Sequence, residues 1–163
     1  MQKYFTPAQV EIIAYCLMPN HYHLLVCLNS DDLARVMQPF ALSYSKAIAK
    51  RFGRTGTLFQ GPFKSRLVDK NEYLLHLSRY IHLNPVFAGL AAKPEDWEFS
   101  SYRDYIDLRS GTFVRPEIIL SQFGREAYRL FVEEYRKEDL RKIEHLMFDF
   151  RDQVSPRDLV SEV

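Results

Sequence analysis

The chain has 163 residues, 47% of them hydrophobic, and a formal net charge of +1. This is enough for one domain with a sizeable core, and no apolar run approaches the roughly 20 residues that a membrane-spanning helix needs. Residues 1–6 lack the apolar core of a signal peptide, so we expect a cytoplasmic protein rather than a secreted or membrane protein. Cys16 and Cys27 are expected to be small apolar side chains rather than a disulfide.

The first predicted elements are two β-strands, over residues 10–18 and 21–28, interrupted by Pro19 and Asn20. We expect the second strand to be central in its sheet and buried on both faces. Alternate residues of a strand share a face, so His21 and His23 should project side by side, roughly 6 to 7 Å apart along the backbone. This spacing suits a shared metal ion, although two histidines in such a pattern are more often a half-exposed strand end.

A helix is predicted over about residues 33–52, after capping side chains at 29–32. Pro39 should bend this helix or divide it, and Gly53 and Gly56 should end it. The following residues, 57–68, are predicted to form short strands that turn at Gly61.

A second helix should begin near residues 69–71 and run to about Leu83, closing at Asn84 because Pro85 disfavours helical geometry in the residue before it. Four polar or aromatic residues of this helix are spaced by three or four and should share one face: Tyr73, His76, Tyr80 and Asn84. Amphipathic helices are then predicted over 116–120, 125–137 and 138–150, with a break at Gly124 and a frayed last dozen residues.

Basic residues gather in the middle of the chain. Residues 46–79 hold eight Lys or Arg against two acidic residues, whereas residues 95–163 hold eleven against sixteen. Because Phe52, Phe59 and Phe63 lie among these cations, the segment combines charge that neutralises phosphates with rings on which unpaired bases can stack. A single-stranded nucleic acid would suit it, and a solvated basic face over a few core aromatics is the alternative.

Four motifs in order resemble a known family: Met-Pro-Asn-His-Tyr-His-Leu-Leu-Val at 18–26, Gly-Thr-Leu-Phe-Gln-Gly-Pro-Phe-Lys-Ser at 56–65, Arg-Tyr-Ile-His-Leu-Asn-Pro-Val at 79–86 and Ser-Ser-Tyr at 100–102. They are similar to the single-tyrosine HUH transposases, and most similar to the repeat-associated tyrosine transposases of bacteria. Residues 118–124 also resemble the carboxy-terminal extension of that branch.

The resemblance implies an α+β fold, with a ferredoxin-like antiparallel sheet, helices packed on it and a helical carboxy-terminal extension. It implies a transposase domain over residues 1–110 and the extension over 111–163. The metal ligands would be His21, His23 and Asn84, the cofactor Mg²⁺ or Mn²⁺, and the nucleophile Tyr80. A phenol hydroxyl ionises only near pH 10, so it needs a cation or a base to attack phosphorus at neutral pH.

The family's chemistry is metal-dependent nicking and strand transfer of single-stranded or hairpin DNA through a 5′-phosphotyrosine intermediate, which places the protein at the bacterial nucleoid. A homodimer is an expected assembly, and no membrane is involved. Six basic residues are the expected phosphate contacts: Lys46, Lys50, Arg51, Arg54, Lys64 and Arg66.

One departure from the family concerns the start of the sheet. Relatives usually carry a strand and a helix before the strand that here includes Tyr15, whereas this sequence reaches that strand almost at once. We therefore expect the first strand of the sheet to be missing, which would leave backbone groups unpaired beside the metal site. A second copy filling the gap, a truncated remnant and a lost beginning of the sequence are the three interpretations.

Two other functions remain open at this point. One is a catalytically inactive or truncated descendant that only binds hairpin DNA, and the other is a metal-dependent hydrolase of small phosphodiesters. Tyr73 is the rival nucleophile, and His76 could assist proton transfer to or from Tyr80. His76 and His82 are more often surface or packing residues on such a helix, and the aromatic residues at 97, 102 and 105 are assigned to packing.

Overall fold

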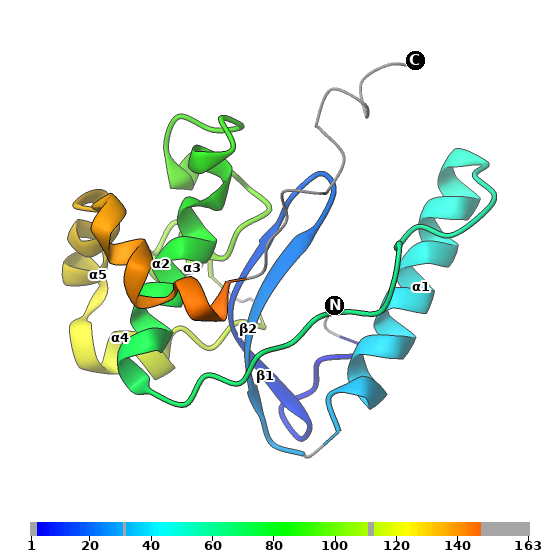
Figure 1. The fold of residues 1–163 in the computed structure, drawn as a ribbon, viewed down its shortest axis with the longest axis horizontal. Coiled ribbons are helices and arrows are strands. Elements are labelled where there is room, and N and C mark those ends of the chain that lie inside the picture. The colour runs from blue at the N-terminus through cyan, green and yellow to red at the C-terminus, as the bar shows by residue number, and fades with distance from the viewer. Residues whose placement is uncertain (1–2, 31, 111–112, 148–163) are drawn as a thin grey trace. The chain divides into compact units, whose positions relative to one another are not determined.

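The protein is described by a computed structural model over residues 3–30, 32–110 and 113–147 (Figure 1). Its chain divides into two compact units. The first comprises Met1–Glu11 and Val26–Arg66, and the second comprises Ile12–Leu25 and Leu67–Val163.

Strands β1 (Val10–Leu17) and β2 (Tyr22–Leu28) form a two-stranded antiparallel sheet, which confirms both predicted strands and the α+β class (Figure 1). The ferredoxin-like topology stays a prediction, because the described residues hold these two strands only. The expectation that the second strand is central and buried on both faces is wrong. Most of β2 is half-buried and its Leu28 is 46% exposed, whereas residues 12–16 of β1 are all buried.

Later segments of the chain cover the outer edge of β1. Ile12 forms a parallel bridge with Val114, and Cys16 forms an antiparallel bridge with Ser100. The Leu17 N–H donates to the Phe99 carbonyl over 2.9 Å. Residues 99–101 and 114–115 therefore pair with backbone groups of β1 that would otherwise be left at an open sheet edge.

The first unit contains α1 (Ala34–Phe52), the cyan helix of Figure 1. Pro39 lies inside this helix without dividing it, and Gly53 ends it in the left-handed conformation with φ 61°. Phe40 lies on the buried side of the helix, where its ring packs on Phe5 at 5.3 Å between centroids. The core of this unit is thus built on the amino-terminal half of α1.

The short strands predicted over residues 57–68 are wrong, because the structure describes this whole segment and shows no strand there. Most of these residues are exposed, and within the described chain no strand pairs with the N–H and C=O groups of the segment. Pro62 also removes one of the donors that a strand would use.

The described residues of the second unit form four α-helices, namely α2 (Asn71–Phe87), α3 (Tyr102–Tyr105), α4 (Glu117–Phe123) and α5 (Arg125–Glu133). The predicted end of α2 at Asn84 is wrong, since the helix continues through Pro85 to Phe87. Pro85 is fully buried, so its packing outweighs the hydrogen bond that its missing N–H would have made.

The carboxy-terminal prediction is confirmed in part. Gly124, with φ 73° and ψ 163°, separates α4 from α5 as expected. The predicted helix over 125–137 is shorter, and the one over 138–150 is replaced by the 3₁₀ helices η2 (Lys137–Lys142) and η3 (Glu144–Leu146). A further 3₁₀ helix, η1 (Pro94–Asp96), precedes α3. Residues 148–150 and the predicted frayed end lie outside the described residues.

In the part of the chain that the structure describes, the helices are too short or too polar to cross a membrane. Cys16 and Cys27 are both free thiols, as expected, with Cys16 buried and Cys27 half-buried.

Candidate functional site

The turn between β1 and β2 brings the two histidines of the first motif together. The Met18 N–H donates to the His21 carbonyl over 2.8 Å and closes this turn. The Nε2 atoms of His21 and His23 then lie 3.0 Å apart, with the two rings perpendicular. As predicted, the two imidazoles therefore lie side by side.

Burial keeps both imidazoles neutral at pH 7. It lowers the pKa of His21, and it lowers the pKa of His23 to about 3, with a smaller contribution from the neighbouring His21. A side-chain hydrogen bond with Asn84 opposes this shift in the pKa of His23. Neutral imidazoles keep a ring nitrogen lone pair for a cation.

Helix α2 supplies the other half of the site. The ring of Tyr80 packs on the ring of His23, with centroids 5.8 Å apart. Asn84 lies one helical turn further on, is 9% exposed, and donates from Nδ2 to the Tyr80 carbonyl over 3.4 Å. Four predicted site residues, all within the second unit, thus lie together: His21, His23, Tyr80 and Asn84.

This donor set fits a divalent cation. Two imidazole nitrogens bound at right angles, each about 2.1 Å from a metal, would lie about 3 Å apart, and the observed separation of the Nε2 atoms is 3.0 Å. The amide of Asn84 can add an oxygen ligand, which Mg²⁺ and Mn²⁺ prefer. Among the residues that the structure describes, no three or more His, Cys, Asp and Glu side chains form a group that could hold a metal ion.

The side chains predicted to share one polar face of α2 contact two different parts of the protein. His76 is directed toward the carboxy-terminal helices, where its Nδ1 lies 3.0 Å from Nη2 of Arg79 and its ring packs on Phe131. Tyr73 packs on the ring of His145 with centroids 5.0 Å apart. The contacts of Tyr80 are instead with His23 and with Phe87, near the end of α2.

The six predicted phosphate contacts all belong to the first unit and all have exposed side chains. Three lie on the last turns of α1 and three on the irregular segment after it: Lys46, Lys50, Arg51, Arg54, Lys64 and Arg66. Phe52, on the same helix, is 62% exposed, with the Arg51 guanidinium 5.6 Å from its centroid. Their role in binding DNA stays a prediction.

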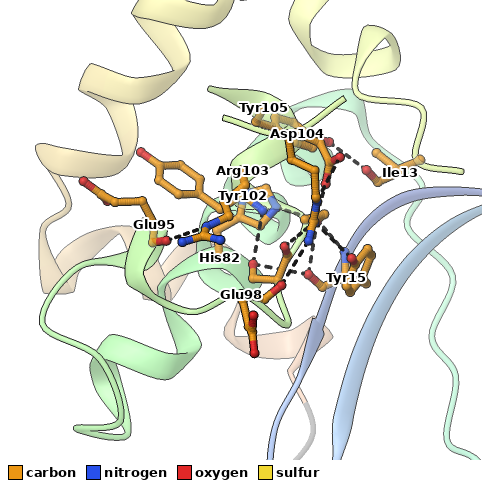
Figure 2. A network of polar contacts seen from close by, with 12 residues as sticks. Ile13, Tyr15, His82, Glu95, Glu98, Tyr102, Arg103, Asp104 and Tyr105 are labelled. Atoms are coloured by element: carbon orange, nitrogen blue, oxygen red, sulfur yellow. Dashed lines mark hydrogen bonds and ion pairs between the residues drawn. The ribbon is translucent and has the colours of Figure 1, made fainter. Parts of the chain in front are cut away.

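Sequence reasoning missed a buried polar network behind the site, which Figure 2 shows around His82 and Tyr15. His82 was expected to be a surface or packing residue, and the structure shows it fully buried with hydrogen bonds at both ring nitrogens. The available signal was that His82 and Ser101 both lie within the motifs at 79–86 and 100–102. Tyr102 and Tyr105 are buried, as their assignment to packing predicted.

A protein-family model described as "Transposase IS200 like" matches residues 1–84 of this chain. The chain belongs to the IS200-like transposase family. The matched region contains all four residues of the candidate site, and the resemblance inferred from the motifs is confirmed. Transposases of this family are generally metal-dependent.

A named relative of this transposase-family chain is a REP-associated tyrosine transposase of Haemophilus influenzae, which is 28% identical over 103 residues. The aligned region covers 56% of this chain and 58% of the relative, so the chain spans less than two thirds of that protein. No solved structure matches the chain.

Proposed function

We propose that the protein nicks single-stranded DNA and transfers the cut strand, with Tyr80 as the nucleophile and a divalent metal ion as cofactor. The observation that supports this most directly is the contact between Tyr80 and His23, whose ring centroids are 5.8 Å apart in one unit of the chain. Membership of the transposase family supports an enzyme that acts on DNA.

Three side chains would hold the metal ion, namely His21 and His23 through ring nitrogens and Asn84 through its amide oxygen. When bound, a divalent cation polarises a phosphate and neutralises the charge that develops on it. The half-buried Tyr80 packs on the ring of His23, so in this proposal its hydroxyl would attack a phosphate held beside these ligands.

In the proposed reaction, the Tyr80 hydroxyl oxygen attacks a backbone phosphorus atom. A new phosphorus–oxygen bond forms to the phenol, and the bond from phosphorus to the 3′ oxygen of the preceding nucleotide breaks. The phenol gives up its proton and the released 3′ oxygen takes one up. One ester replaces another, so a later attack by a 3′-hydroxyl can rejoin a strand and free Tyr80 without ATP.

The substrate class follows from the family and from the exposed cations of the first unit. Lys46, Lys50, Arg51, Arg54, Lys64 and Arg66 would contact phosphates, which position a strand without reading its sequence. Exposed Phe52 beside Arg51 would favour unpaired bases over a duplex, because only unpaired bases offer a free face for stacking. We therefore propose a hairpin with single-stranded flanks as the substrate.

The test is a search for the covalent intermediate. The protein is incubated with Mn²⁺ and a library of hairpin oligonucleotides labelled at the 3′ end, and the products are separated by denaturing electrophoresis. The wild type should give a labelled protein band, Tyr80→Phe should give none, and Tyr73→Phe should retain it as the matched control. A labelled adduct that persists in Tyr80→Phe would overturn the proposal. DNA binding without any adduct in the wild type would instead indicate an inactive descendant.

A further inference from the structure

His82 lies in the sequence between the two site residues of α2 and is fully buried. Both of its ring nitrogens have partners, since Nδ1 lies 2.8 Å from the Tyr128 hydroxyl and Nε2 lies 2.8 Å from Oγ of Ser101. The rings of Tyr102 and Tyr105 pack against the imidazole with centroids 5.4 and 4.7 Å away (Figure 2). The imidazole therefore cannot turn without breaking buried hydrogen bonds.

The Ser101 arm of this network connects α2 to β1. Oγ of Ser101 accepts from the Tyr15 N–H over 2.8 Å and donates to the Tyr15 carbonyl over 3.1 Å. The Ser101 N–H donates to the same carbonyl over 2.9 Å. A short path of hydrogen bonds thus runs from His82 through one serine to the backbone of β1, and β1 pairs with β2, which carries His23.

The second arm fixes the neighbouring turn of the same helix. The Tyr128 hydroxyl, on α5, lies 2.9 Å from Oγ of Ser78, which is fully buried one turn before His82. Tyr128 therefore contacts α2 at two consecutive turns, and a rotation of the helix would separate it from both residues.

Helix geometry relates this inward face to the candidate site. Successive residues of an α-helix are about 100° apart, so a residue two positions from another points to the opposite side. Tyr80 and Asn84 are each two positions from His82. The direction in which His82 enters the core therefore determines the direction in which these two side chains leave the helix.

We propose that His82 is a positioning residue, which through Ser101 and Tyr128 sets the rotation of α2 and so holds Tyr80 and Asn84 against His23. An apolar side chain could fill the same volume, but it would not demand one orientation, whereas a buried imidazole with two partners does. The consequence for catalysis rests on the proposed function above, and the consequence for geometry does not.

The test compares two variants, each of which loses the hydroxyl of one buried tyrosine. Tyr128→Phe removes a hydroxyl that bonds to His82, whereas Tyr105→Phe removes an equally buried hydroxyl that donates to the Ile13 carbonyl over 2.9 Å. In each purified variant, with circular dichroism confirming the fold, the nuclear Overhauser effect between the Tyr80 and His23 ring protons is measured on selectively labelled protein without metal. Ser101→Ala provides a second, independent break in the network.

We expect the Tyr80–His23 signal in the wild type and in Tyr105→Phe, and its loss or clear weakening in Tyr128→Phe and Ser101→Ala. The rate constant of adduct formation should fall roughly tenfold to a hundredfold in the latter two, with the DNA concentration for half-maximal rate unchanged. An undiminished signal in both network variants, or equal loss in Tyr105→Phe, would overturn the proposal. If the wild type forms no adduct, the proposed function fails while the nuclear Overhauser comparison still decides the role of His82.

Discussion

His21 and His23 approach each other through their Nε2 atoms, which are 3.0 Å apart beside the turn that joins β1 and β2. Such an approach of two ring nitrogens is either a hydrogen bond between neutral imidazoles or the geometry of a shared cation, and the two differ in what happens when Mn²⁺ is added.

We expect Mn²⁺ to bind the wild type at one site, and His21→Ala and His23→Ala each to weaken binding at least tenfold. The loss should be larger for His23→Ala, because His23 also contacts Asn84. Isothermal titration calorimetry measures both affinities. His145→Ala, which changes an exposed histidine of η3, is the control and should bind like the wild type. Unchanged affinity in both site variants would contradict a metal centre here.

A second prediction concerns Arg79, whose side chain is 4% exposed. Its guanidinium pairs with Asp139 at 2.8 Å and lies 3.8 Å from the ring centroid of Phe131. Arg79→Ala should lower the free energy of unfolding by about 3 kcal/mol, because it removes a buried, paired cation and its packing. Arg129→Ala breaks an exposed pair with Glu133, which solvent screens, and should leave the free energy of unfolding nearly unchanged. Urea unfolding of both variants tests this, and equal costs would contradict it.

A third prediction concerns stability in alkali. Burial raises the pKa of the Cys16 thiol from 9.0 to about 12. Between these values the unfolded chain loses a proton that the folded chain keeps, so the unfolded state binds fewer protons and stability falls as pH rises. The free energy of unfolding should drop by about 1 kcal/mol between pH 8 and pH 10 on account of this group. Urea unfolding at both values should show a smaller drop in Cys16→Ala, and an identical drop would contradict the assignment.

The same burial predicts which thiol reacts. Iodoacetamide at pH 8.5 should modify the half-buried Cys27 and leave the fully buried Cys16 unmodified until urea unfolds the protein. Mass spectrometry of the digested protein assigns the modified position. Modification of Cys16 at the rate of Cys27 in the native protein would show that β1 opens readily.

A fifth prediction tests the cations of the first unit. Lys50→Gln together with Arg54→Gln should weaken the binding of single-stranded DNA and reduce the dependence of log K on log salt concentration by about 0.7 for each phosphate that the variant no longer neutralises. Fluorescence anisotropy between 50 and 200 mM salt measures both. Arg129→Gln, on α5, is the matched control for removal of an exposed charge. A salt dependence equal to that of the wild type would show that Lys50 and Arg54 do not contact the DNA.

The sequence predicts elements well where the signal is local. The strands around Tyr15 and His23 and most of α1 follow from side-chain alternation, helical spacing and the left-handed Gly53. The end of α2 does not, because the local rule against a helical residue before Pro85 is outweighed by the burial of that proline. Residues 57–68 show the reverse case, in which a strand-like composition lacks a neighbouring strand to pair with.

The residues of the candidate site were likewise predictable only where the signal lies in a local pattern or motif. The pairing of His21 with His23 follows from strand alternation, and the choice of Tyr80 and Asn84 came from the resemblance of their motif. The motif around His82 marks the residue but does not identify its partners, because Ser101 and Tyr128 lie 19 and 46 residues further along the chain. Such interactions depend on how distant segments pack, and no spacing within α2 indicates them.

The cover on the outer edge of β1 has a practical consequence for anyone shortening this protein. A fragment ending at residue 84 would keep every side chain of the candidate site but would lack residues 99–101 and 114–115, which pair with Ile12, Tyr15 and Leu17. Its uncovered strand would then offer unpaired backbone N–H and C=O groups to neighbouring molecules. We therefore expect such a fragment to precipitate, or to give a series of oligomers after chemical cross-linking, under conditions in which the longer chain stays dispersed.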